Sequence, residues 1–306
     1  MSPTTTIDWQ HWLQRWDEQQ TRYLPEREER FTVMLDALAA LLPPDFVALD
    51  LACGPGAISQ RLLVRFPQAC TIALDYNPVL LHLGRQALGT MGGRISWLAQ
   101  SLNEPSWTEP VQKALAQLGR SQFDAVLSTT ALHWLPIGQL TQVYNQLGAL
   151  VRSGGVLLNG DHMAYPPSLP VFRQLATEHS ALLRRVAFEE QGGEDYRQWW
   201  DAITQGWLAA DPSLQQLFDQ YQANERGRNR SFSEPIELVH RAALIDAGFT
   251  QVDTLWQRYD NRVLLAVRGQ SLEPVQNGAC AYLFTTIALV CTTLRATSYR
   301  GLPGRP

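Results

Sequence analysis

An apolar run, residues 46–51, leads directly into a glycine turn and then into a helical pattern. Gly54 and Gly56 let the backbone turn tightly, and the helix beginning near Ala57 offers unpaired N–H groups over the turn. A strand, a glycine turn and a helix in this order build a nucleotide pocket. Asp50 lies at the strand end, where a carboxylate repels phosphate and suits a cationic, amine-bearing ligand.

Asp75 places a second acidic group at the spacing that ribose recognition uses. It follows the apolar run 69–74 and comes about 20 residues after Gly56. An acidic side chain at that distance accepts hydrogen bonds from ribose hydroxyls. Asn77 and Pro78, directly after it, predict a capped helix start.

A nicotinamide-dependent oxidoreductase is one alternative that this turn raises. The dinucleotide fingerprint requires a third glycine, and Ser59 occupies that position. Lys113 is the only lysine of the chain, which leaves almost no place for a Tyr-Lys dehydrogenase pair. Together with Asp50, these residues disfavour a dehydrogenase.

The stretch Asp50-Leu51-Ala52-Cys53-Gly54-Pro55-Gly56 resembles the first motif of class I S-adenosylmethionine (SAM)-dependent methyltransferases. The resemblance implies SAM as the cofactor and S-adenosylhomocysteine as the product. It also implies a Rossmann-like α/β fold with a seven-stranded, mostly parallel sheet whose last strand is antiparallel. The cofactor pocket is then assigned to Asp50, Ala52, Gly54, Gly56, Asp75, Tyr76, Ser101, Leu102 and Thr129.

Ser101 is the point where the chain departs from the family pattern. Many members carry an aspartate there that hydrogen-bonds the adenine amino group, followed by an apolar residue. A serine hydroxyl accepts the same hydrogen bond more weakly, and Leu102 can still pack against the ring.

Two histidines are the candidate catalytic residues. His133, in the His133-Trp134 pair after the fourth strand, resembles a subgroup that includes trans-aconitate methyltransferase. His162 follows Asp161 at the end of the fifth strand. Either histidine could act as a general base or orient the substrate, because histidine titrates near neutrality. Asp161 could orient His162, although neighbours on a strand point to opposite faces. Both residues could instead cap or pack.

The spacing of apolar runs predicts the elements that position these residues. Short runs alternate with helical patterns, which indicates βαβ units and a parallel sheet with ligands at the strands' carboxyl ends. The strands are expected at 46–51, 69–74, 95–99, 123–128, 155–159, 251–256 and 262–267. Gly92-Gly93 and Ser153-Gly154-Gly155 are expected to separate units, and Ser233 to cap the last helix.

Five segments follow from this pattern. Residues 1–45 form an N-terminal helical cap, 46–162 the SAM-binding core, 163–234 a helical lid, 235–269 the end of the core, and 270–306 a tail of unassigned role. The lid holds Tyr196, Trp199, Trp200 and Trp207, which either line the pocket or fill a core. The apolar run 279–294 in the tail falls short of the ~20 residues that a spanning helix needs, so no stable membrane anchor is expected.

Composition and charge exclude several classes of partner. A formal net charge of −4 disfavours nucleic acid, which requires a basic surface. Cys53, Cys70, Cys280 and Cys291 lack Cys-x-x-Cys spacing, so neither a disulfide framework nor a metal site is predicted. With no signal peptide apparent, the expected location is cytoplasmic.

The sequence therefore predicts a methyltransferase acting on an oxygen or nitrogen of a small molecule, with a carboxylate as one acceptor. The arginines Arg226, Arg228 and Arg230 suit a carboxylate, although such a run is more often a solvated loop. A protein that binds SAM or a nucleotide without transfer activity is the alternative. The acceptor and the oligomeric state stay open.

Overall fold

The computed structural model describes residues 6–226 and 235–269. Its centre is one sheet in the order β3-β2-β1-β4-β5-β7-β6. The strands are β1 (Val47–Leu51), β2 (Cys70–Asp75), β3 (Ile95–Ala99), β4 (Phe123–Thr129), β5 (Val151–His162), β6 (Phe249–Arg258) and β7 (Asn261–Arg268). Strands β1 to β5 run parallel, and β7 is antiparallel to both β5 and β6. The sheet expected from the sequence is confirmed.

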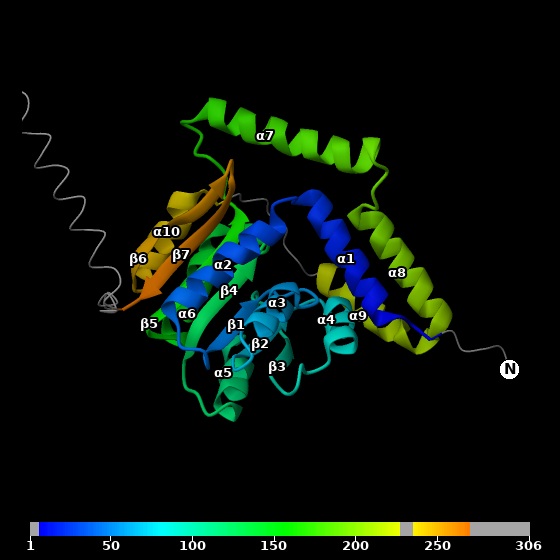
Figure 1. Ribbon diagram of the computed structural model, residues 1–306, viewed down its shortest axis with the longest axis horizontal. Coiled ribbons are helices and arrows are strands. Elements are labelled where there is room, and N and C mark those ends of the chain that lie inside the picture. The colour runs from blue at the N-terminus through cyan, green and yellow to red at the C-terminus, as the bar shows by residue number, and fades with distance from the viewer. Residues whose placement is uncertain (1–5, 227–234, 270–306) are drawn as a thin grey trace, which may run out of the picture. The chain divides into compact units, whose positions relative to one another are not determined.

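Helices cover both faces of this sheet (Figure 1). The helices of the core are α3 (Ala57–Arg65), α4 (Pro78–Leu88), α5 (Thr108–Gln117), α6 (Ile137–Leu150) and α10 (Glu237–Asp246). Apolar residues of α5, α6 and α10 pack with one face, and those of α3 and α4 pack with the other. Every residue of β1 is buried, which agrees with a central strand covered on both sides.

The N-terminal segment forms two helices, α1 (Trp9–Tyr23) and α2 (Arg27–Leu41). Residues of α2 join the core on the α3 side of the sheet. Helix α1 places Leu13 and Trp16 in a separate apolar cluster with α4. Leu13 and Trp16 therefore lie on the packing face of α1.

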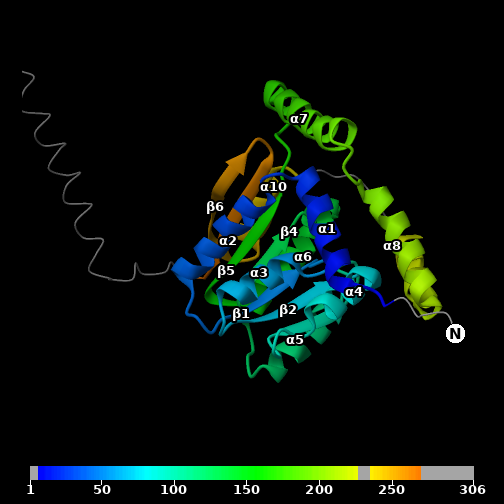
Figure 2. The ribbon, with the colours of Figure 1, turned by 45° about the vertical axis from the view of Figure 1, so that its right-hand side comes forward.

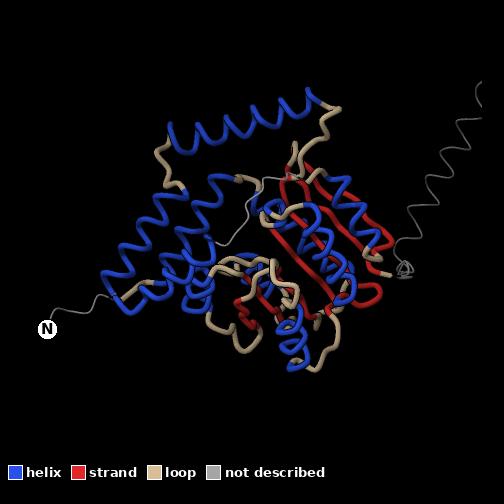
Figure 3. Tube along the Cα trace, turned by 180° about the vertical axis from the view of Figure 1, so that it is seen from behind, coloured by secondary structure: helices blue, strands red, loops and turns tan. Residues whose placement is uncertain are grey.

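Residues 163–226 form helices in the described part of the chain: α7 (Pro170–Arg184), η2 (Arg185–Glu190), α8 (Tyr196–Ala210), η3 (Pro212–Leu214) and α9 (Gln215–Arg226). Helix α7 leads from the end of β5 toward α8, which lies beside α1 (Figure 2). Viewed from behind, α8 and α9 lie at one side of the strands, and α7 runs across the top (Figure 3). Trp199 and Trp207 of α8 are fully buried against α1, α4 and α9, so these two fill a core.

One local prediction needs correction. The Ser153-Gly154-Gly155 stretch does not separate two units, because it lies inside β5, where the register with β4 shifts between Phe123 and Ala125. The glycines thus form an irregularity of the strand. The last core helix begins at Glu237, and its expected cap at Ser233 lies outside the described residues.

Candidate functional site

The turn between β1 and α3 has three residues in the left-handed region. Ala52 has φ 59°, Gly54 has φ 56° and Gly56 has φ 87°. Gly56 is also the residue that precedes the first turn of α3. An alanine in this conformation costs free energy that a glycine avoids, so the turn is held by its surroundings. One interaction that holds the turn is the hydrogen bond from the Cys53 N–H to the Leu74 carbonyl, at 2.9 Å.

The two glycines of the turn have different surroundings. A Cβ added to Gly54 would meet only side chains at 3.9 Å, from Leu80 and Trp16. A Cβ added to Gly56 would lie 2.5 Å from the Trp97 indole. Gly54 therefore leaves room beside the backbone, whereas Gly56 is required by packing against β3. The sequence analysis assigned both glycines to the cofactor pocket.

Asp75 lies at the end of β2 and faces the turn. Its Oδ2 accepts the Gly54 N–H at 2.7 Å, and its Oδ1 accepts the Asn77 N–H at 2.8 Å. Asn77 caps α4 by accepting the N–H groups of Val79 and Leu80, as predicted. The carboxylate is thus fixed between the glycine turn and the next helix, at the position predicted for ribose binding.

Asp50 lies beneath the turn, with 2% of its surface exposed. Its Oδ2 accepts the Ser59 hydroxyl hydrogen at 2.7 Å. Burial raises the pKa of Asp50 to about 7, and the charge of Asp75 adds to the rise, while the Ser59 bond opposes it. Ser59, which breaks the dinucleotide fingerprint, is therefore the hydrogen-bond donor that braces Asp50.

The other predicted cofactor residues line the ends of neighbouring strands. The Tyr76 hydroxyl donates to Glu225 of α9 at 2.8 Å, and Asn224 donates to the Tyr76 carbonyl. Helix α9 therefore lies against the end of β2. Ser101 accepts the Asn103 N–H at 3.2 Å and Leu102 packs partly buried against the core, both after β3. Thr129 ends β4 and pairs with Gly160 of β5.

His133 and Asp161 form a pair at the carboxyl ends of β4 and β5. His133 lies in a short 3₁₀ turn, Leu132–Trp134, just after β4. Its Nδ1 lies 2.6 Å from Oδ1 of Asp161, and its backbone N–H donates to Oδ2 at 3.0 Å. The Asp161 side chain is fully buried. Burial alone would raise its pKa, but the charges of His133, His162 and Arg30 hold the pKa of Asp161 well below its usual range.

His162 has a different carboxylate partner. Its Nδ1 lies 3.4 Å from Asp260, in the turn between β6 and β7, and its imidazole ring lies 6.4 Å from that of His133. The interpretation that Asp161 orients the His162 ring is therefore wrong, because Asp161 reaches only the His162 backbone N–H. Neither the His133–Asp161 contact nor Asp260 was predicted. No local pattern signals them, since each joins loops distant in sequence.

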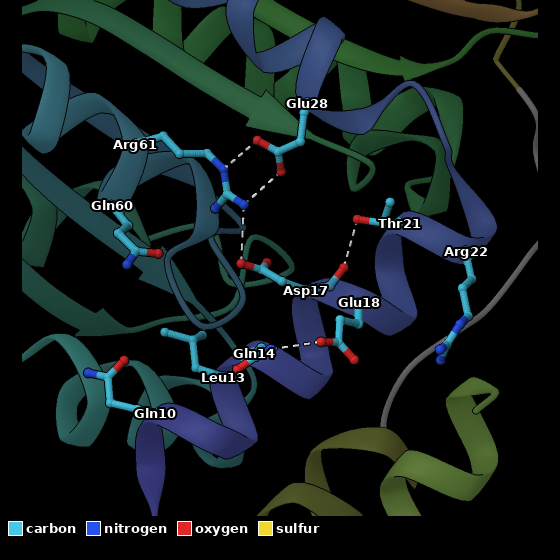
Figure 4. A pocket seen from close by; sticks show the side chains of 10 residues that line it. All are labelled: Gln10, Leu13, Gln14, Asp17, Glu18, Thr21, Arg22, Glu28, Gln60 and Arg61. Carbon is cyan, nitrogen blue, oxygen red and sulfur yellow. Dashed lines mark hydrogen bonds and ion pairs between the residues drawn. The ribbon is translucent and has the colours of Figure 1, made fainter. Parts of the chain in front are cut away.

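A polar cavity of about 630 Å³ lies between α1, α3 and the start of α2. Arg61 of α3 reaches across it to Glu28 and Asp17, at 2.6 and 3.2 Å (Figure 4). Because these ion pairs fix charged side chains of the lining and none of the predicted site residues contributes to it, we do not place the reaction there.

Within residues 6–226 and 235–269, no cluster of three or more His, Cys, Asp or Glu side chains could hold a metal ion. No helix in these ranges is long and apolar enough to cross a bilayer. The tail run 279–294, Cys280, Cys291, Arg228 and Arg230 lie outside the described residues.

Comparison with known proteins gives matches to methyltransferases. A family model described as "Methyltransferase domain" matches residues 48–155. A trans-aconitate 2-methyltransferase of Azoarcus sp. is 31% identical over 144 residues, 46% of this chain and 49% of that protein. A malonyl-[acyl-carrier protein] O-methyltransferase of Legionella pneumophila is 29% identical over 110 residues, 36% of this chain and 34% of that protein. The chain thus spans about half or less of the length of these relatives.

Among solved structures, a possible exported protein from Bordetella parapertussis aligns with a TM-score of 0.51. It is 17% identical, and the alignment covers 79% of this chain and 68% of that protein. This likeness concerns the fold alone.

Proposed function

We propose, from the premise that this chain belongs to the class I SAM-dependent methyltransferases, that it transfers a methyl group to a carboxylate oxygen of a small acid. The observation that carries the proposal is the His133–Asp161 pair at the same sheet edge as the glycine turn. The relatives support it, because trans-aconitate and a malonyl group both carry carboxylates.

The residues around the turn fit the cofactor. Gly54 leaves space beside the backbone, Asp75 presents a carboxylate for a ribose diol, and Leu102 offers an apolar surface for adenine. When bound, SAM supplies an electrophilic methyl group. Asp50, Ala52, Tyr76, Ser101 and Thr129 complete the proposed pocket, and their roles stay predictions.

His133 has one role if the acceptor is a carboxylate. An ionised carboxylate in contact with Nδ1 stabilises the imidazolium form of a histidine. Asp161 is ionised and fully buried, so it favours a cationic His133 whose Nε2–H donates to the substrate anion. No base is needed for an acceptor that is already ionised, and the rate comes from holding oxygen and methyl group in line.

The same pair supports a second acceptor class. With an alcohol, phenol or amine, neutral His133 would take the acceptor's proton at Nε2, while Asp161 holds Nδ1–H. The two acceptor classes require opposite protonation states of His133. Activity should therefore fall as His133 loses its proton in the carboxylate case, and rise in the base case.

Methyl transfer can be measured directly. Purified protein is incubated with methyl-labelled SAM and a panel of small carboxylic acids, with the matching amides and phenols as controls. We expect methyl esters and S-adenosylhomocysteine from the acids only, with kcat/KM falling at high pH. Methylation of phenols or amines with kcat/KM rising with pH would contradict the carboxylate proposal. Tight SAM binding without transfer to any acceptor would instead favour a non-catalytic binding protein.

A further inference from the structure

Arg30 of α2 is a fully buried cation at the carboxyl edge of the sheet. It packs against β5 at Gly160, where an added Cβ would lie 3.0 Å from Arg30 Cδ and Nε. Glycine at this position therefore admits the arginine side chain. Gly160 is the residue directly before Asp161.

The guanidinium of Arg30 connects the ends of two strands. It donates to the Thr130 hydroxyl after β4 and, at 3.0 Å, to Asn261 Oδ1 at the start of β7. Thr130 has φ 55° and its N–H bonds the Gly160 carbonyl at 2.9 Å. A β-branched residue rarely adopts this conformation, so the contact with Arg30 helps to hold the segment that leads to His133.

The charge of Arg30 has no described carboxylate in contact with it. In the described part of the chain no carboxylate lies within 4 Å of its guanidinium, and its buried Nε has no hydrogen-bond partner. Burial, together with the charge of neighbouring Arg27, lowers the pKa of Arg30 to about 10, and the charges of Asp161 and Glu26 oppose this from a distance. A buried cation without a contacting anion is costly, and groups with strongly perturbed pKa values cluster at functional sites.

We propose that Arg30 is a positioning residue for the His133–Asp161 pair: it fixes the Thr130 segment and its charge limits protonation of the two side chains. The proposal rests on the proposed function only for the meaning of His133 in catalysis. The structure and charge of the pair can be measured without turnover. Among the described residues, the other titratable or charged groups around the pair and Arg30 are His162, Asp260, Glu26, Arg27, Tyr144 and His240.

The test is the protonation of His133, followed by NMR of the histidine side chains across a pH series. In Arg30→Met the cation is lost at similar length, so His133 should bind its proton roughly tenfold more tightly and titrate at higher pH. Arg30→Lys keeps the charge but not the planar fork. In this variant, His133 should titrate at nearly the same pH as in the wild-type protein. Its kcat should be lower, because Thr130 is held less well.

Arg152→Met is the matched control. Arg152 pairs with Asp124 at 2.6 Å near the start of β5, the far end of the strand from Asp161. Its loss should lower stability without moving the His133 titration.

An unchanged titration in folded Arg30→Met, or an equal shift in Arg152→Met, would overturn the proposal. If Arg30→Met does not fold, Arg30→Lys decides: a shift as large as tenfold despite the retained charge would overturn it. A wild-type protein inactive on every acid would overturn the proposed function and leave this titration result standing.

Discussion

Asp161 binds both the backbone N–H and the ring Nδ1 of His133, at 3.0 and 2.6 Å. One buried carboxylate therefore fixes the position and the ring orientation of the histidine together. Because the Nδ1 atom is engaged, proton exchange or anion binding falls to Nε2.

Asp161→Asn should lower kcat/KM by roughly 10²-fold or more, because the amide no longer supports a cationic His133. The sign of the pH effect follows from the lost charge. Without Asp161 the imidazolium gives up its proton at lower pH, so the falling limb expected for a carboxylate acceptor should move to lower pH. Initial rates over a pH series measure both effects, and calorimetry should show SAM affinity nearly unchanged.

Asp124→Asn serves as the control for that variant. Asp124 is also buried, and it accepts the Val47 N–H at 2.8 Å, far from the carboxyl ends of the strands. It should lose stability but keep the wild-type pH profile. If both variants change the profile alike, the His133–Asp161 pair has no special part in the reaction.

The sequence predicted the sheet and most elements because their signals are local. Buried strands are recognisable as apolar runs. Asn77-Pro78 predicts a helix start because an asparagine side chain caps the first N–H groups and proline is favoured in the first turn. The position of Asp75 followed from a spacing that the βαβ unit fixes. The predicted division into a cap, core, lid and tail stays a prediction.

The side-chain partners could not be predicted in the same way. Asp161 meets His133 across two strands, and Trp97 meets Gly56 across the turn, so both contacts depend on tertiary packing. Arg30 lies in a run of charged residues typical of a solvated helix face, yet it is fully buried. Only the register of β4, β5 and β7 brings its partners Thr130 and Asn261 together.

Asp75→Ala should weaken binding of SAM and S-adenosylhomocysteine by about 1.5 to 3 kcal/mol, because ribose hydroxyls lose a charged acceptor. The same change removes the acceptor of the Gly54 and Asn77 N–H groups, so the melting temperature should also fall. Asp75→Asn retains one acceptor oxygen, so its SAM affinity and its melting temperature should both lie between those of the wild-type protein and Asp75→Ala. Unchanged calorimetric affinity in folded Asp75→Ala would show that Asp75 only braces the turn.

Gly54→Ala and Gly56→Ala should separate binding from stability. At Gly56 a Cβ meets Trp97 at 2.5 Å, so this variant should lose roughly 2 to 4 kcal/mol of folding free energy. At Gly54 the nearest atoms are at 3.9 Å, so backbone strain alone should cost about 1 kcal/mol. Because Gly54 faces the proposed pocket, its variant should lose the larger share of SAM affinity. Denaturant unfolding and calorimetry on both variants check this, and the reverse pattern would contradict the assignment.

Ser101→Asp should leave SAM affinity equal or higher, since a carboxylate is the stronger acceptor for an adenine amino group. Ser101→Ala should weaken binding modestly, by about 1 kcal/mol or less, and it also removes the acceptor of the Asn103 N–H. If both variants bind SAM within error of the wild-type protein, backbone groups alone hold the adenine.

Asp50 should make the folded protein less stable as pH rises from about 4 to 7. Below pH 4 the carboxyl is protonated in both the folded and the unfolded state, so burial costs nothing extra. Between pH 4 and 7 the unfolded chain loses this proton while the folded chain, with its pKa raised to about 7 by burial, keeps it. The free energy of unfolding should therefore fall by an amount on the order of 2 to 4 kcal/mol over this window. Asp161 has the opposite effect on stability: because its pKa is lowered in the folded protein, it makes the protein more stable as pH rises, and it does so at lower pH than Asp50.

Asp50→Asn can still accept the Ser59 hydroxyl hydrogen but does not titrate. Urea unfolding at pH 5 and pH 8 should therefore show a smaller loss of stability for Asp50→Asn than for the wild-type protein. Equal losses would mean that Asp50 is ionised in the folded protein throughout this range.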